Sequence, residues 1–153
     1  MRASRLALFA ALLLAGCDVF ESGSPIPFRV VADTTIVLPD TLDSRIGVHA
    51  LLRTQQEADA LRATYGLGVS TVPDVDWSRE SVFVIANRLN NNRRLVVTRV
   101  AIYGTDRVEY TYEQRLVAAP ATGLHTVLVA VATERISEDY GVAVVGNGLQ
   151  SGR

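Results

Sequence analysis

Two runs of apolar, mostly β-branched residues constrain the fold of this chain most strongly. Residues 81–86 (SVFVIA) are apolar almost throughout, and residues 124–133 (LHTVLVAVAT) are the most apolar of the segments that we expect to be strands. A strand with one face in solvent alternates apolar and polar side chains, whereas a strand covered on both faces is apolar along its length. The first run therefore predicts a strand that other elements cover on both sides.

Further strands are expected on either side of these runs. Residues 28–38, 46–52 and 142–145 are short segments rich in β-branched and other apolar residues. The segment from Leu95 to Arg115 predicts an antiparallel hairpin, because two alternating stretches flank the turn at residues 104–106 (GTD). Polar connections are expected at residues 39–45, 87–94, 118–123 and 134–141.

One amphipathic helix is expected to begin after Thr54. The sequence Thr54-Gln55-Gln56-Glu57 matches a capping box, in which the Thr hydroxyl and the Glu carboxylate satisfy free N–H groups reciprocally. Ala58, Leu61 and Tyr65 then form one apolar stripe, and a glycine at 66 or 68 ends a helix of about 12 residues. The elements together predict an α+β fold: a mostly antiparallel β-sheet with one packed amphipathic helix.

The N-terminus indicates export and a lipid anchor. Residues 1–15 begin with Arg2 and Arg5 and continue as a ten-residue apolar stretch, too short to span a bilayer. Residues 14–17 (LAGC) resemble the lipobox of bacterial lipoproteins. The resemblance implies cleavage between Gly16 and Cys17, lipidation of Cys17 through a thioether, and a cell-envelope location on a membrane that the chain does not span. An ordinary secretory signal with an incidental cysteine is the alternative.

These boundaries divide the chain into four parts. Residues 1–16 are expected to be a lipoprotein signal peptide, and residues 17–27 the lipidated N-terminus and a short tether without an apolar face. Residues 28–146 would form one α+β globular domain, and residues 147–153 a flexible tail.

Composition excludes several classes of function. Loss of Arg2 and Arg5 with the signal peptide would change the formal charge from −1 to −3, which disfavours nucleic-acid binding. All 15 basic residues are arginines, so no lysine can form a Schiff base or a phosphate loop. Cys17 is the only cysteine and there are two histidines, so internal disulfides and cysteine- or histidine-rich metal sites are excluded. We expect no cofactor and no metal, although a mixed carboxylate site stays open.

The best candidates for contact with a partner are arginines and tyrosines. Arg88, Arg93 and Arg94 fall in the expected polar loop and could bind carboxylates or phosphates, or they could be a solvated loop tip. Tyr110 and Tyr112, with Tyr103 nearby, could form a contact face, although cross-strand pairing within the sheet is the simpler account.

Candidate catalytic groups are few. His49 and His125 each lie in an expected strand, and catalysis would require a nucleophile or a carboxylate beside one of them. Asp74 and Asp76 place two carboxylates on one side of an extended segment, which could bind a cation, but a solvated turn is the favoured interpretation. We therefore expect no catalytic residue.

One stretch of the chain resembles a known family. Residues 75–84 (VDWSRESVFV) enter an apolar strand after the helix, and residues 95–98 (LVVT) follow a loop. This succession resembles the C-terminal domain of PrcB-type bacterial lipoproteins, which are accessory subunits of a surface protease complex. The resemblance covers about residues 54–132 and implies a non-catalytic domain that binds or stabilises a partner protein.

The chain also departs from that family's pattern. Trp77 stands where a phenylalanine is usual, residues 89–94 are rich in Asn and Arg where the family has a Gly-rich loop, and residues 119–121 (APA) echo a later motif only loosely. The sequence therefore predicts a lipid-anchored envelope protein that binds a partner protein without catalysis. An envelope hydrolase using His49 or His125, or a small-ligand carrier, are the alternatives.

Overall fold

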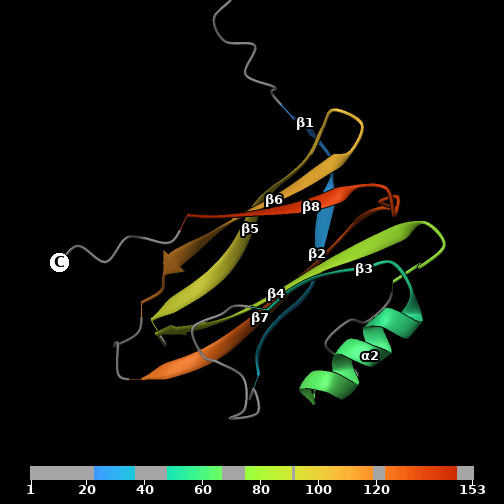
Figure 1. Cartoon of the computed structure of the whole chain (residues 1–153). Helices are drawn as coiled ribbons and strands as arrows, with labels where there is room; N and C mark the ends of the chain where they lie inside the picture. The colour runs from blue at the N-terminus through green and yellow to red at the C-terminus, as the bar shows by residue number, and fades with distance from the viewer. Residues whose placement is uncertain (1–22, 37–47, 67–74, 91, 119–122, 148–153) are drawn as a thin grey trace, which may run out of the picture.

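The computed structural model describes residues 23–36, 48–66, 75–90, 92–118 and 123–147. These residues form two four-stranded β-sheets stacked on each other, with one helix against the outer side of one sheet (Figure 1). All but one of the strand pairs are antiparallel. The expected α+β class, mostly antiparallel sheet with a single packed helix, is confirmed; its division into two sheets was not predicted.

Sheet B lies in the middle of the three layers. Its strand order is β2-β7-β4-β3, and every neighbouring pair is antiparallel. The strands are β2 (Phe28–Ile36), β7 (Leu124–Glu134), β4 (Glu80–Asn90) and β3 (Val48–Leu52). The two apolar runs of the sequence are thus the two central strands of the sheet that is covered on both faces.

Sheet A forms an outer layer. Its order is β1-β5-β6-β8, from β1 (Ser24–Pro25) through β5 (Arg93–Tyr103) and β6 (Arg107–Leu116) to β8 (Gly141–Asn147). The hairpin expected between Leu95 and Arg115 is the antiparallel pair β5–β6, and Gly104 in its turn has a φ of 58°, where glycine is favoured. β8 runs parallel to β6, a pairing that needs a long connection and leaves no local signature.

The alternation of side chains along β4 and β7 divides the interior into two cores. Phe83 and Ile85 face sheet A and pack with Val129 and Val131 against residues of β5 and β6. Val82 and Val84 point to the other side, where they pack with Ala58 of the helix. Since successive side chains of a strand point to opposite faces, an apolar run is what two covered faces require.

The helix follows its sequence signals closely. Helix α2 (Gln55–Tyr65) begins after the N-cap Thr54 and has both hydrogen bonds of the capping box with Glu57. It ends at Gly66, whose φ of 65° is left-handed. Trp77 donates from Nε1 to Oε1 of Gln55 over 2.8 Å, which ties the helix to the segment that leads into β4.

The expected loop at residues 87–94 was wrong. β4 continues to Asn90 and β5 already begins at Arg93, so only a short connection crosses from sheet B to sheet A. In this stretch exposed polar residues alternate with the buried Leu89, and a single apolar residue was too weak a signal for a strand.

The expected tether is also shorter than predicted. Ser24 and Pro25 form strand β1, pairing with Ile102 and Ala101, and the N–H of Ile26 donates to the carbonyl of Val100 over 3.0 Å. Proline is tolerated there because β1 is an edge strand. Residues 1–22 and 148–153 lie outside the described residues, and Asn147, expected in the tail, ends β8.

Two tyrosines pack over glycines at the two edges of sheet A. A Cβ on Gly23 would lie 2.5 Å from the ring of Tyr103, and one on Gly146 would lie 2.4 Å from the ring of Tyr112. An aromatic ring laid over an edge glycine supplies packing that the glycine itself lacks. Tyr112 thereby helps to hold β8 against β6.

Candidate functional site

The three candidate arginines lie at one end of the sandwich, on different faces. Arg88 is opposite Thr126 and has the same orientation as Val84, so it lies on the helix side of sheet B. Arg93 is half-buried, and its Nη1 donates to Oε1 of Gln114 over 3.2 Å. Arg94 is exposed on the outer face of sheet A. The structure therefore brings them to one end of the molecule but not into one cluster.

A fourth arginine, which the sequence analysis did not single out, lies at the same end. Arg115 is directly opposite Arg94 across the β5–β6 pair, an arrangement of like charges that costs stability. The Nε of Arg115 pairs with Oε1 of Glu113. Within the described residues Arg94 has neither a hydrogen bond nor an ion pair. We call these four residues, Arg88, Arg93, Arg94 and Arg115, the arginine end.

Tyr110 does not belong to a contact face. It is completely buried and stacks on Phe83, with ring centroids 4.0 Å apart and planes 15° from parallel. The predicted partner contact through Tyr110 is therefore wrong, because the packing of sheet A on sheet B buries this face of β6. Tyr112 points the same way but is only half-buried, 6.1 Å from the ring of His49. Tyr103 lies under the guanidinium of Arg107, 4.7 Å from its ring centroid.

Burial leaves the hydroxyl of Tyr110 without a hydrogen-bond partner in the described residues. The same burial is the largest effect on the pKa of Tyr110 and raises it to about 12; the Thr133 hydroxyl and Arg53 act to lower it, but the Thr133 hydroxyl donates to the carbonyls of Ser81 and Glu134 and makes no hydrogen bond with the Tyr110 hydroxyl. A buried polar group without a partner lowers the free energy of unfolding, so this hydroxyl destabilises the core.

We expect Tyr110→Phe to raise the free energy of unfolding at pH 7 by about 1 kcal/mol, because it removes the buried hydroxyl. In the parent, an unfolded tyrosine ionises near pH 10 but the folded Tyr110 only near pH 12. Stability should therefore fall between these values by about 1.4 kcal/mol per pH unit from this group, and less in the variant. Urea unfolding at pH 7 and at pH 9–12 measures both; equal alkaline slopes would contradict the assignment.

The two histidines lie on different strands of sheet B. His49 lies in β3 with its ring 6.4 Å from that of Phe83, and partial burial lowers its pKa. His125 lies opposite Leu89, and its Nδ1 is buried without a partner in the described part of the chain. Neither ring hydrogen-bonds a carboxylate there, and no group of three or more metal-ligating side chains occurs in the same residues.

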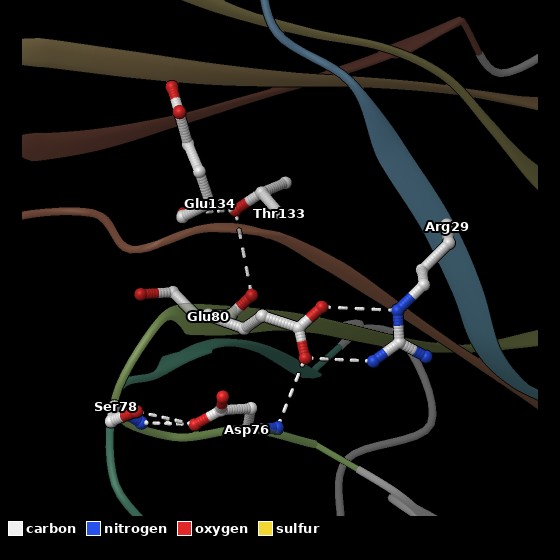
Figure 2. Close-up of polar contacts among 7 residues, drawn as sticks. Arg29, Asp76, Ser78, Glu80, Thr133 and Glu134 are labelled. Atoms are coloured by element: carbon white, nitrogen blue, oxygen red, sulfur yellow. Dashed lines mark hydrogen bonds and ion pairs between the residues drawn. The ribbon is translucent and has the colours of Figure 1, made fainter.

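The carboxylates before β4 are held by local bonds (Figure 2). Oδ1 of Asp76 accepts from the N–H and hydroxyl of Ser78 over 3.1 and 2.6 Å, which lowers the pKa of Asp76. Glu80 accepts from Nε and Nη2 of Arg29 over 3.1 and 2.8 Å and from the N–H of Asp76 over 3.1 Å. The bidentate bond from Arg29 is the main reason that the pKa of Glu80 is lowered.

This network has a structural role. Arg29 is in register with Ala132, whose small side chain lets the guanidinium reach from β2 across β7 to Glu80 at the start of β4. The interpretation of Asp76 as part of a solvated turn fits these bonds. Asp74, the other candidate of that pair, lies outside the described residues.

An apolar groove lies between α2 and sheet B. It measures about 210 Å³, including space open to solvent, and all its lining residues are apolar except for the Tyr65 hydroxyl. The lining comprises Ile36, Val48, Leu61, Tyr65, Val84, Ala86 and Leu128. Ligand pockets enclose most of the ligand and carry a few precisely placed polar groups, whereas this groove is partly open to solvent and almost wholly apolar, so it gives little support to a small-ligand carrier.

Comparison with models of protein families, with curated proteins and with solved structures gave no match. Among the described residues, no helix has the length and apolar character needed to cross a membrane.

Proposed function

We propose that this chain is a bacterial envelope lipoprotein, anchored through lipid on Cys17, whose arginine end binds a partner protein without catalysis. The proposal is supported above all by one observation: the start of the described chain and the pair Arg94 and Arg115 lie at opposite ends of sheet A. The described chain starts at Gly23 beside Tyr103, whereas Arg94 and Arg115 lie at the other end of the β5–β6 hairpin.

The short stretch of chain between Cys17 and Gly23 limits how far sheet A can lie from a lipid on Cys17. Five residues separate Cys17 from Gly23, and a chain of that length reaches at most roughly 20 Å. β5 spans eleven residues, which is roughly 33 Å at the usual rise of a strand. With upright strands, a lipid on Cys17 would hold the Gly104 turn near the membrane and place the arginine end at the far side, where another protein can reach it.

The chemistry of the arginine end suits a protein partner with exposed carboxylates. Arg88 and Arg94 are exposed, and neither is paired within the described residues. Guanidinium groups bind carboxylates in a bidentate way and are enriched in protein interfaces. Because Arg115 already pairs with Glu113, a partner's carboxylate would bind chiefly to Arg94, which has no partner within the described residues.

The resemblance to PrcB-type lipoproteins suggests the kind of partner. Its family role would make the partner an envelope protease, with this chain as an accessory subunit. In the position of that family's Gly-rich loop this chain has the end of β4 and the start of β5, which carry Arg88, Arg93 and Arg94. The arginine end would thus take the place of the loop as the contact surface.

Affinity capture of the tagged full chain from its own host tests the proposal. We expect one envelope protein to be enriched with the parent chain, and the double variant Arg88→Glu, Arg94→Glu to lose at least tenfold of that enrichment. Arg107→Glu is the matched control, because Arg107 is also exposed but lies at the opposite end beside Tyr103. Equal loss in the control, or no enriched protein, would contradict the proposal.

A further inference from the structure

Among the described residues nothing pairs with the outer edge of β8, and this edge is unlike the other three sheet edges. β8 (GVAVVGN) is the last strand of sheet A and has seven residues, none of them charged and none of them proline. β1, at the opposite edge, has two residues, and β3 has five. β2 carries Arg29 and Asp33 and a register shift between Val30 and Ala32. Short length, charges and bulges are the usual protections of an edge strand, and β8 has none of them.

The side chains of β8 are also partly exposed on both faces of sheet A. Val142 is opposite the buried Val108 and so faces the sheet-B side, yet it is 43% exposed. On the outer face Val145 is 40% exposed, while Val144 still touches the core. Both the backbone edge and the apolar side chains of β8 are therefore accessible.

We propose that β8 binds an extended, uncharged, β-branched segment of a partner protein, which adds a fifth strand to sheet A. Such strand addition takes affinity from backbone hydrogen bonds and specificity from alternate side chains. The neutral edge favours a segment without charges, since no group on β8 would offset their desolvation. One face of the added strand would cover Val142 and the other Val145.

A second copy of this chain fits the edge less well. Two-fold symmetry would pair β8 with its own copy in antiparallel orientation, which sends the Gly23 ends of the two copies in opposite directions. Here the inference rests on the proposed lipid anchor: a reach of roughly 20 Å cannot serve both ends of upright strands roughly 33 Å long. A partner's segment is not restricted in this way.

Photo-crosslinking in the native host tests the inference. With benzoylphenylalanine at position 145 of the full chain, we expect one crosslinked envelope protein, mapped by mass spectrometry to an uncharged segment without proline. Val142→Lys and Val145→Lys should each lower that protein's capture at least tenfold, because a charge protects an edge strand. Val30→Lys is the matched control, since Val30 is 57% exposed on the edge strand β2.

A synthetic peptide of the mapped segment gives a second measurement. When added to the purified full chain, it should slow amide hydrogen exchange of residues in β8 and leave the exchange in β2 unchanged. A crosslink between two copies of this chain, a crosslink to a charged or helical surface, or the absence of protection in β8 would each overturn the inference. If capture depends on Arg88 and Arg94 but not on Val142 and Val145, the proposed function stands and the role of β8 fails.

Discussion

Replacing Cys17 with alanine should abolish incorporation of a labelled fatty acid into this protein. A thioether needs the thiol, and Cys17 is the only cysteine of the chain. Each buried methylene contributes about 0.8 kcal/mol to membrane binding, so losing several acyl chains removes almost the whole anchor. The variant should also keep residues 1–16, because the lipobox requires a cysteine after the cleavage point.

The measurement is labelling of cells with a clickable fatty acid, followed by purification and the mass of the N-terminal peptide. Arg94→Ala is the control and should be labelled and processed like the parent, because it leaves residues 14–17 intact. Undiminished label in the Cys17→Ala protein would refute the assignment of Cys17 as the lipidation site.

Phe83→Ala should destabilise the domain by about 3–5 kcal/mol, the usual cost of removing a buried phenylalanine. Phe83 is completely buried between the two sheets and stacks on Tyr110 at 4.0 Å, so its loss leaves a cavity where the sheets meet. Since domains are typically stable by about 5–15 kcal/mol, this loss removes a large part of the free energy of unfolding.

Urea unfolding of the parent and the variant measures this cost. Val30→Ala is the matched control: Val30 is 57% exposed, so the change should be below about 0.5 kcal/mol. A cost for Phe83→Ala below about 1 kcal/mol would mean that the two sheets do not pack through this ring.

The elements that the sequence predicted well are those with local signals. Thr54 and Glu57 form the capping box through bonds within one turn, and Gly66 ends the helix by its own conformation. The apolar run at residues 81–86 directly indicates a strand whose two faces are both buried. These features depend on neighbours a few residues away, which a single sequence contains.

The features that were missed depend on distant contacts. Tyr110 and Tyr112 lie on the same face of β6, yet only the stacking of sheet A on sheet B decides that Tyr110 is buried under Phe83. The parallel pairing of β8 with β6 and the pairing of Ser24 with Ile102 likewise join segments far apart in the chain. No periodicity within either segment indicates its partner.

In the candidate site, too, residues with a local signal were found and a residue that depends on a distant contact was missed. Arg88, Arg93 and Arg94 were chosen because they cluster in an expected polar loop; the structure places them on strands β4 and β5 instead, at one end of the sandwich. Arg115 was missed because it is 21 residues from Arg94 in sequence, and only the register of the hairpin places it opposite. A register counted outward from the Gly104 turn would have paired Arg94 with Leu116, because the bulge between Val97 and Arg99 shifts the pairing by one residue.

We propose above all that the arginine end of this chain, anchored by lipid on Cys17, faces its partner protein. The most direct test compares photo-crosslinkers at two exposed positions of the full chain in its own host, Arg94 at the arginine end and Thr105 in the opposite turn. We predict that position 94 captures one envelope protein and that position 105 captures lipid or nothing. Capture of the same protein at position 105 with none at position 94 would contradict the account.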